Sequence, residues 1–185
     1  MRDNFTPDSS PTFVSKRVEA ATPHSALRLE TEIDGVFVLS YPQVKYEYGS
    51  LTEVFHPEWQ ELFEEQILHC YFITNQNGTR QEWHYHEHTV DRYSMISGKL
   101  EVALFDPREN SVTKGKLITL DLEGVSSGVS GNHGLRIPQG VWHSFKSSVD
   151  FTLMNFKTLP FNRAQPDKFL VSMPNNLCDF TWISK

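Results

Sequence analysis

Short runs of β-branched and aromatic residues recur along most of the chain. Gly, Pro, Asn or Asp separates one run from the next. Val, Ile, Phe and Tyr favour extended backbone, and turn residues between such runs mark the ends of strands. Many short strands at close spacing are typical of an antiparallel sandwich or barrel. We therefore predict an all-β fold with strands within residues 36–44, 67–75, 92–98, 99–107, 116–122, 134–145 and 150–156.

Helical periodicity is sparse by comparison. The stretch PEWQELFEEQI at residues 57–67 begins with proline and places Trp59, Leu62, Phe63 and Ile67 at roughly helical spacing. Proline is favoured in the first turn of a helix, and apolar residues three or four positions apart form one helix face. We expect one short helix here, and at most two in the whole chain.

Length and composition favour one folded domain preceded by an arm. The 185 residues suit a single domain with a sizeable core. Residues 1–28 are rich in Ser, Thr, Pro and charge, so they have little apolar surface to bury. We expect residues 1–28 to be a polar N-terminal arm and residues 29–185 to form the domain.

Charge and hydropathy exclude several classes of protein. A formal net charge of −6 argues against an extended nucleic-acid surface. No run of about 18 apolar residues occurs, so we expect no membrane association and a cytoplasmic location. Cys70 and Cys178 lie apart from any ligand-like cluster, and we expect each to be a buried free thiol.

The most unusual stretch is GTRQEWHYHEHTVDRYSMISG, residues 78–98. If residues 83–88 are extended, His84, His86 and His88 project from one face of the strand. A solvated strand face can also carry a histidine. Three histidines followed by the carboxylate of Asp91 instead favour a divalent-metal site or a proton-transfer site, because both need imidazole and carboxylate groups.

A second segment, RIPQGVWHSF at residues 136–145, places another histidine after a tight turn. Together the two segments resemble the paired signature of the cupin superfamily. Asp91 stands where the first cupin motif has a glutamate, which has one more methylene. The residues in register are Gly78, His84, His86, Asp91 and Gly98 in the first motif, and Pro138, Gly140 and His143 in the second.

From about residue 33 to residue 183 the chain resembles the dTDP-4-dehydrorhamnose 3,5-epimerase (RmlC-like) family. The resemblance implies an antiparallel double-stranded β-helix, also called a cupin or jelly-roll barrel, with a sugar nucleotide bound inside. It also implies a homodimer and a reaction without a metal. The similarity is carried by GSLTEVFHPEW (49–59), GTRQEWHY (78–85), SGKLEVALFDPRENSVTKGK (97–116), IPQGVWHSF (137–145) and VSMPNNLCDFTW (171–182).

The same resemblance assigns catalytic roles to individual residues. Family members remove a proton next to a keto group with a histidine held by an aspartate, and return it from a tyrosine. His84 matches the base, and Asn175 is the nearest match to the aspartate. The tyrosine is expected where this chain reads LPF at residues 159–161, which offers no phenol. Candidate substrate-binding residues are Arg80, Arg92, Arg136 and Tyr85.

Three classes of function remain open at this point. The first is an isomerase or epimerase acting on a nucleotide-linked 4-keto sugar, with no cofactor. The second is a metal-dependent cupin enzyme acting on another small carbonyl or carboxylate substrate. Its ligands to zinc, iron, manganese or nickel are expected to be His84, His86, Asp91 and His143. The third is a non-catalytic sugar-binding cupin. Fold resemblance alone does not separate the three.

Overall fold

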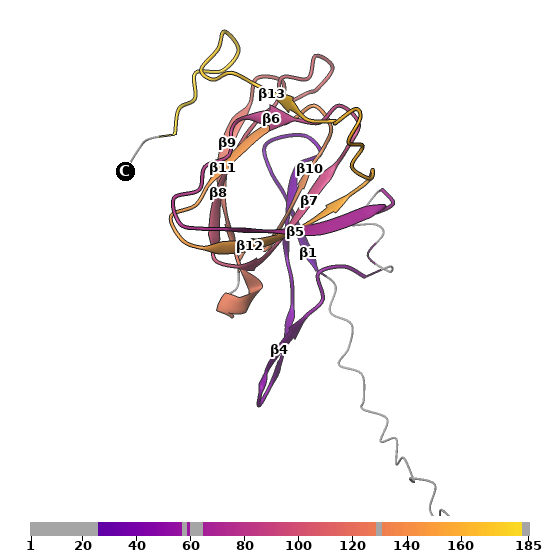
Figure 1. The fold of residues 1–185 in the computed structure, drawn as a ribbon, viewed down its shortest axis with the longest axis vertical. Coiled ribbons are helices and arrows are strands. Elements are labelled where there is room, and N and C mark those ends of the chain that lie inside the picture. Colours follow the sequence, from indigo (N-terminus) through magenta and orange to yellow (C-terminus); the bar gives the residue numbers. More distant parts are fainter. Residues whose placement is uncertain (1–25, 57–58, 60–64, 129–130, 183–185) are drawn as a thin grey trace, which may run out of the picture.

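The computed structural model describes residues 26–56, 59, 65–128 and 131–182, and this part of the chain is built almost entirely from antiparallel strands (Figure 1). A six-stranded sheet and a five-stranded sheet form the body. The first sheet has the order β1 (Leu27–Glu30), β2 (Phe37–Ser40), β10 (Gly134–Ile137), β7 (Asp91–Ser97), β12 (Phe151–Lys157) and β5 (His69–Asn75). The second has the order β13 (Phe169–Leu170), β6 (His84–Tyr85), β11 (Trp142–Lys146), β8 (Lys99–Phe105) and β9 (Leu117–Glu123).

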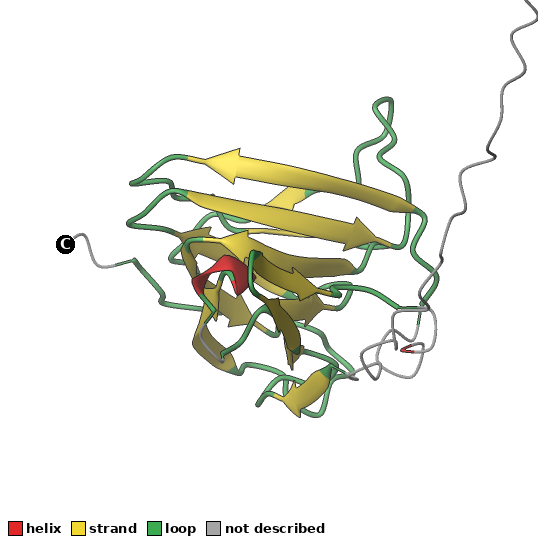
Figure 2. Ribbon diagram, turned by 90° about the horizontal axis from the view of Figure 1, so that it is seen from below, coloured by secondary structure: helices red, strands yellow, loops and turns green. Residues whose placement is uncertain are grey.

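The two sheets face each other across one hydrophobic core, as the layered strands of Figures 1 and 2 show. Strand β8 illustrates why the sequence folds this way. Leu100, Val102 and Leu104 alternate along the strand and enter the central core. Ala103 and Phe105 point the other way and are covered by a second cluster that includes C-terminal residues. Residues of β8 are therefore buried on both faces, so this strand lacks the apolar–polar alternation of a half-exposed strand.

A third cluster lies on the outer side of the six-stranded sheet. Phe37 and Leu39 project there from β2 and pack against Tyr41 and Trp59. A separate hairpin, β3 (Gln43–Tyr46) with β4 (Gly49–Thr52), projects from the body at the bottom of Figure 1. Among the described residues, one helical segment is complete, the 3-10 turn η2 (Val125–Ser127).

These observations confirm the predicted all-β double-stranded β-helix, and each predicted strand range overlaps an observed strand. Strand β1 begins at Leu27, and its first residues Leu27 and Arg28 pair with β2. Most of the expected helix at residues 57–67 lies outside the described residues. Both cysteines are free, but Cys70 is exposed and only Cys178 is buried, because Cys70 points outward from the edge strand β5. Within the described residues no helix is long and apolar enough to span a membrane.

Two of the three glycines of the paired motif, Gly98 and Gly140, occupy turns that strongly favour glycine. Gly98, between β7 and β8, has φ of 79°, and a Cβ there would lie 2.2 Å from the Asp150 carbonyl oxygen. Gly140, in the turn before β11, has φ of 77°. Because a positive φ is costly for residues with a Cβ, both positions favour glycine. The two turns place the strands that carry the histidine and aspartate side chains.

Candidate functional site

A cavity of about 630 Å³ opens beside the histidines of the first motif. Its volume lies within the range of small-molecule sites in proteins. Strands β5, β6, β7 and β12 supply part of the lining, and the segment from Leu159 to Lys168 supplies another part. The loops on either side of β6 supply the remainder. The lining mixes imidazoles, phenols, amides, two lysines and two carboxylates with a few apolar side chains.

Pairing between short strands brings His84 and His143 together. They are direct partners in the β6–β11 pair, and their ring centroids lie 4.1 Å apart. His86 follows two residues after His84 on the same face, with ring centroids 5.7 Å apart. His84, His86 and His143 are all buried, whereas the His88 side chain is 72% exposed at the rim of the cavity. The structure thus brings three of the four motif histidines into one buried group.

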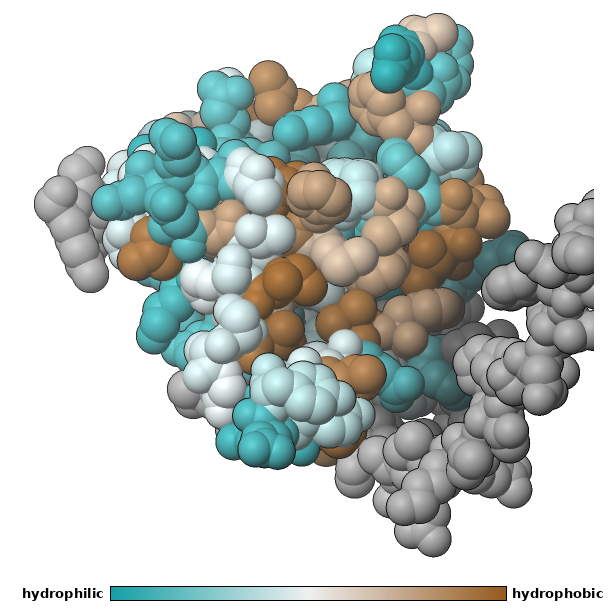
Figure 3. Space-filling model, turned by 60° about the horizontal axis from the view of Figure 1, so that its bottom comes forward, coloured by the Kyte–Doolittle hydropathy of each residue, from teal (hydrophilic) through white to brown (hydrophobic). Residues whose placement is uncertain are grey.

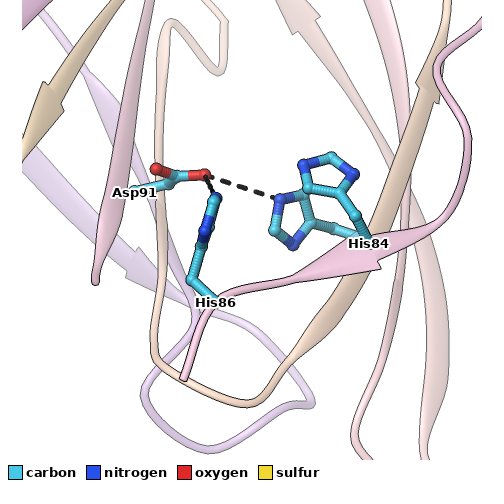
Figure 4. Close-up of side chains that lie close together, drawn as sticks. His84, His86 and Asp91 are labelled. Carbon is cyan, nitrogen blue, oxygen red and sulfur yellow. Dashed lines mark ion pairs between the residues drawn. The ribbon is translucent and has the colours of Figure 1, made fainter. Parts of the chain in front are cut away.

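Asp91 lies next to this group at the start of β7, and its side chain is 2% exposed (Figure 4). Its Oδ1 accepts hydrogen bonds from Lys157 Nζ at 2.9 Å and Asn155 Nδ2 at 3.0 Å. Its Oδ2 lies 3.2 Å from His86 Nε2 and 3.5 Å from His143 Nε2. The shorter side chain of aspartate therefore still reaches the histidines.

These partners determine the charge of Asp91. Burial by itself would raise the pKa of this carboxyl group, because it disfavours the charged form. The contacts with His143 and His86 and the positive charge of Lys157 outweigh burial and hold the pKa well below its usual range. Asp91 is therefore an anion at neutral pH.

The hydrogen bonds of the rings indicate their tautomers. The Nδ1 atom of His84 lies 3.0 Å from the Glu82 carbonyl oxygen, and that of His143 lies 3.1 Å from the Val141 carbonyl oxygen. His86 Nδ1 contacts the carbonyl oxygen of Asp167 in the same way. A carbonyl only accepts hydrogen bonds, so each Nδ1 carries the hydrogen. In the neutral form of His84, Nε2 then has a free lone pair.

His84 is held in the neutral form. Burial lowers the pKa of its imidazole to about 2, and the nearby His143 and Lys168 act in the same direction. A neutral imidazole can accept a proton from a substrate or bind a metal ion. The site can therefore support either kind of chemistry that the sequence suggested.

The structure adds two phenols that sequence analysis missed. Tyr71 of β5 and Tyr93 of β7 line the same cavity. Asn155 Nδ2 donates to the Tyr71 hydroxyl at 3.0 Å and to Asp91 at 3.0 Å, which links the phenol to the buried carboxylate. Burial raises the pKa of Tyr71 to about 12, and the charge of Asp91 adds to this. The phenol thus keeps its proton at neutral pH.

Four residues predicted to bind substrate lie away from the cavity. Strand alternation sends Arg92 to the opposite face from Asp91 and Tyr93, and there Arg92 and Arg136 pair with Glu65 beside the outer cluster. Tyr85 points away from His84 and stacks on Phe169 at a centroid distance of 5.2 Å.

The fourth of these residues, Arg80, and the predicted catalytic partner Asn175 also lie away from the cavity. Arg80 forms an isolated bridge with Lys146 before β6 begins. Asn175 lies in a C-terminal turn, where its Oδ1 accepts hydrogen bonds from the backbone N–H groups of Leu177 and Cys178. The structure therefore does not place Asn175 beside His84, and the nearest carboxylate to the histidine group is that of Asp91 instead.

Two facing antiparallel sheets with a histidine-rich cavity between them define a cupin. A model of the family described as dTDP-4-dehydrorhamnose 3,5-epimerase matches residues 30–183. The chain belongs to this family, which confirms the predicted RmlC-like cupin and the predicted epimerase-like enzyme of nucleotide-sugar chemistry. The two alternatives, a different metal-dependent enzyme and a non-catalytic cupin, are not favoured.

Two curated relatives are also similar in sequence. A probable low-salt glycan biosynthesis epimerase of Haloferax volcanii is 32% identical over 126 residues, covering 65% of this chain and 75% of the relative. The spore coat polysaccharide biosynthesis protein SpsL of Bacillus subtilis is 27% identical over 152 residues, covering 81% and 96%.

Solved structures share the fold. An RmlC 3,5-epimerase of Legionella pneumophila, in complex with dTDP-4-keto-L-rhamnose, superposes with a TM-score of 0.72 and 20% identity, covering 85% of this chain and 83% of that one. A dTDP sugar isomerase of Desulfovibrio desulfuricans also gives a TM-score of 0.72 at 20% identity, with coverage of 83% and 94%.

Proposed function

We propose that this protein epimerises a nucleotide-linked 4-keto sugar at a carbon next to the keto group, in the biosynthesis of a glycan or surface polysaccharide. The observation that carries the proposal is the neutral, buried His84, at the edge of a cavity of small-molecule size. Family membership and relatives named for glycan and spore coat polysaccharide biosynthesis support the choice of substrate class. The test is proton exchange at that carbon in deuterated water.

In this proposal His84 is the base. Its Nδ1–H is anchored on the Glu82 carbonyl oxygen, so Nε2 is the atom that accepts the proton. Proton removal leaves an enolate, and its negative charge needs a cation or hydrogen-bond donor nearby. Lys157 and Lys168 line the same cavity and supply positive charge. A negatively charged intermediate beside His84 also favours the imidazolium, which the cavity disfavours when no anion is bound.

Tyr71 is our candidate for the acid that returns a proton, because its phenol lines the cavity and stays protonated at neutral pH. We expect Tyr71→Phe to slow net epimerisation by about 10²- to 10⁴-fold, the usual contribution of a general acid. Deuterium exchange should fall much less, because removal of the first proton needs only the base. Product formation and exchange are measured on the same sample by proton NMR.

Tyr85→Phe is the matched control for this prediction. Tyr85 belongs to β6 but faces away from the cavity and stacks on Phe169, and phenylalanine keeps that stacking. Its turnover should stay within about twofold of the wild type. Equal rates for Tyr71→Phe and the wild type would remove Tyr71 from the mechanism and direct attention to Tyr93.

We also propose a cytoplasmic homodimer. The edge strand β1 exposes Leu27 and Leu29, at 58% and 44%. Among the described residues no strand pairs with its outer edge, which can therefore pair with a strand of a second copy. Figure 3 turns the bottom of Figure 1 forward and shows hydrophobic side chains gathered in patches on that face. Sedimentation of the full chain should give twice the monomer mass at micromolar concentration. A monomer at every concentration would contradict the dimer. Cytoplasmic location is tested by fractionating cells for the epimerase activity.

The expectation of one divalent metal also stays a proposal. Proton transfer by His84 and Tyr71 does not require a metal. One specific arrangement nevertheless favours one: the ligand atoms of His84, His86, Asp91 and His143 all lie within 4.8 Å of one another.

A further inference from the structure

We propose that Asp167 latches residues 159–168, here called the strap, across the cavity, so that the strap encloses the bound substrate. Asp167 acts through the strap and not on the reacting atoms, so it is a positioning residue. This role rests on the proposed function for the identity of the ligand, whereas the latch itself can be tested without turnover.

The strap forms one wall of the cavity. All of its residues except Arg163, Ala164 and Pro166 line the cavity. It contains no strand or helix, although the whole strap is described, and every residue from 159 to 166 is exposed. At its end the strap continues into β13, which pairs with β6, the strand of His84. The strap therefore lies at the surface and leads directly to the strand of the proposed base.

Both ends of the strap are tied to one short turn, residues 86–90, between β6 and β7. Just before the strap, Thr158 Oγ1 accepts a hydrogen bond from the Val90 N–H at 3.0 Å. Near its other end, Asp167 holds the same turn. Within the described part of the chain, residues 159–166 form hydrogen bonds only inside the strap. A surface loop of this length with its two ends close together is an Ω-loop, and such loops are frequently functional.

The carboxylate of Asp167 supplies the attachment at the second end. Its Oδ1 accepts a hydrogen bond from the Glu87 N–H at 2.8 Å. Its Oδ2 accepts from the His88 N–H at 3.1 Å and from Thr89 Oγ1 at 2.6 Å. Hydrogen bonds to an ionised acceptor are stronger than those between neutral groups. One side chain therefore joins the strap to three consecutive residues of the turn.

The strap also presents apolar surface that a ligand can cover. Leu159 and Phe161 line the cavity, yet they are 39% and 60% exposed. Because burial of apolar surface is favourable, a ligand in the cavity gains affinity from both while the strap stays in place. Lys168 directly precedes β13, whose pairing with β6 does not involve Asp167, so its charge remains at the cavity when the latch is lost. Loss of the latch should therefore weaken binding more than it slows the chemical step.

Trypsin can measure the latch, because Arg163 lies in the middle of the strap and is exposed. Asp167→Ala removes three hydrogen bonds, so cleavage after Arg163, followed by mass spectrometry, should be at least about tenfold faster than in the wild type. Asp167→Asn keeps one carbonyl acceptor and should fall between the two. Saturating dTDP-4-keto-6-deoxyglucose should slow this cleavage in the wild type, because the strap then packs on the ligand.

Deuterium exchange on the same sugar nucleotide gives the second readout. Asp167→Ala should raise KM about tenfold and keep kcat within about threefold of the wild type. Asp150→Ala is the matched control, because Asp150 Oδ1 also accepts a backbone N–H, that of Asn77 at 2.8 Å, but does not line the cavity. The control should keep the strap cleavage and the KM of the wild type. Circular dichroism checks that each variant is folded.

Three results would overturn the latch. The first is equal cleavage after Arg163 in the wild type and in folded Asp167→Ala. The second is faster cleavage with an unchanged KM, because the strap then does not enclose the substrate. The third is an equal rise of KM in Asp150→Ala, because the effect is then a general loosening of the fold.

The epimerase proposal is judged separately from the latch. Faster strap cleavage in Asp167→Ala, without deuterium exchange by the wild type, keeps the latch and removes the epimerase. Exchange by the wild type, with strap cleavage and KM unaffected in Asp167→Ala, removes only the latch.

Discussion

Replacing His84 with asparagine should reduce proton exchange on a nucleotide-linked 4-keto sugar by about 10²- to 10⁴-fold. An amide is not a base at neutral pH, yet asparagine has nearly the same polarity and fills part of the same space. His84 is buried against His143 and His86, and it lines the cavity proposed to receive the substrate. Binding of the sugar nucleotide should be little changed, so the loss should appear in the catalytic rate.

Exchange is measured by proton NMR in deuterated water, and binding by calorimetry with the nucleoside diphosphate. His88→Asn is the matched control, because His88 belongs to the same stretch but is 72% exposed. We expect the control to keep wild-type exchange. If His84→Asn keeps wild-type exchange as well, the base is a different residue, and Lys157 becomes the next candidate because it lines the same cavity.

Replacing Asp91 with asparagine should lower the free energy of unfolding by about 3–5 kcal/mol, the usual cost of removing one partner of a buried ion pair. Lys157 is 12% exposed and would keep its charge without the carboxylate that now lies 2.9 Å away. Asn155 Nδ2 donates a hydrogen bond to the Asp91 carboxylate. An asparagine amide group at position 91 can place its own N–H donors toward this donor, and the hydrogen bond is then lost. Urea denaturation gives the change, provided that the slope of the transition is the same for both proteins.

The double variant Asp91→Asn/Lys157→Met is the control for this second prediction. It removes both charges, so neither remains buried without a partner, and it should recover a large part of the lost stability. Asp91→Asn with an unchanged unfolding midpoint would show that the pair contributes little to stability. A double variant as unstable as the single one would show that the Asp91 contacts with histidine matter more than the lysine.

The fold and the histidine group were predictable because local patterns decide them. Runs of β-branched and aromatic residues marked the strands, and turn residues marked their ends. His84 and His86 were predictable as neighbours because alternation puts residues two apart on one face. His143 and Asp91 were found only through motif spacing, since they reach the group from β11 and β7.

The other residues of the cavity depend on sheet pairing, which the sequence does not display. Tyr71 and Asn155 face the cavity because β5 and β12 are paired in the register Asn155↔Tyr71. A shift of one residue would have sent both side chains to the opposite face. For the same reason, the sequence does not single out Lys157.

The positions of Arg92 and Arg136 outside the cavity could have been predicted from strand alternation and pairing. Arg92 follows Asp91 directly, so the two side chains point to opposite faces of β7. Once Asp91 was assigned to the site, this alternation already excluded Arg92 from it. Arg136 pairs with Arg92 across β7 and β10 and lies on the same outer side. Proximity in the sequence to a functional residue was a poor guide here, whereas the period of the strand was a good one.

The central claim is that this cavity exchanges the proton next to the keto group of a nucleotide-linked 4-keto sugar. The most direct measurement is proton NMR of such a sugar, for example dTDP-4-keto-6-deoxyglucose, incubated with the wild-type protein in deuterated water. We predict loss of the signal from a proton next to the keto group, at a rate proportional to enzyme concentration. A substrate that binds but keeps every such proton for as long as it does without protein would contradict the account.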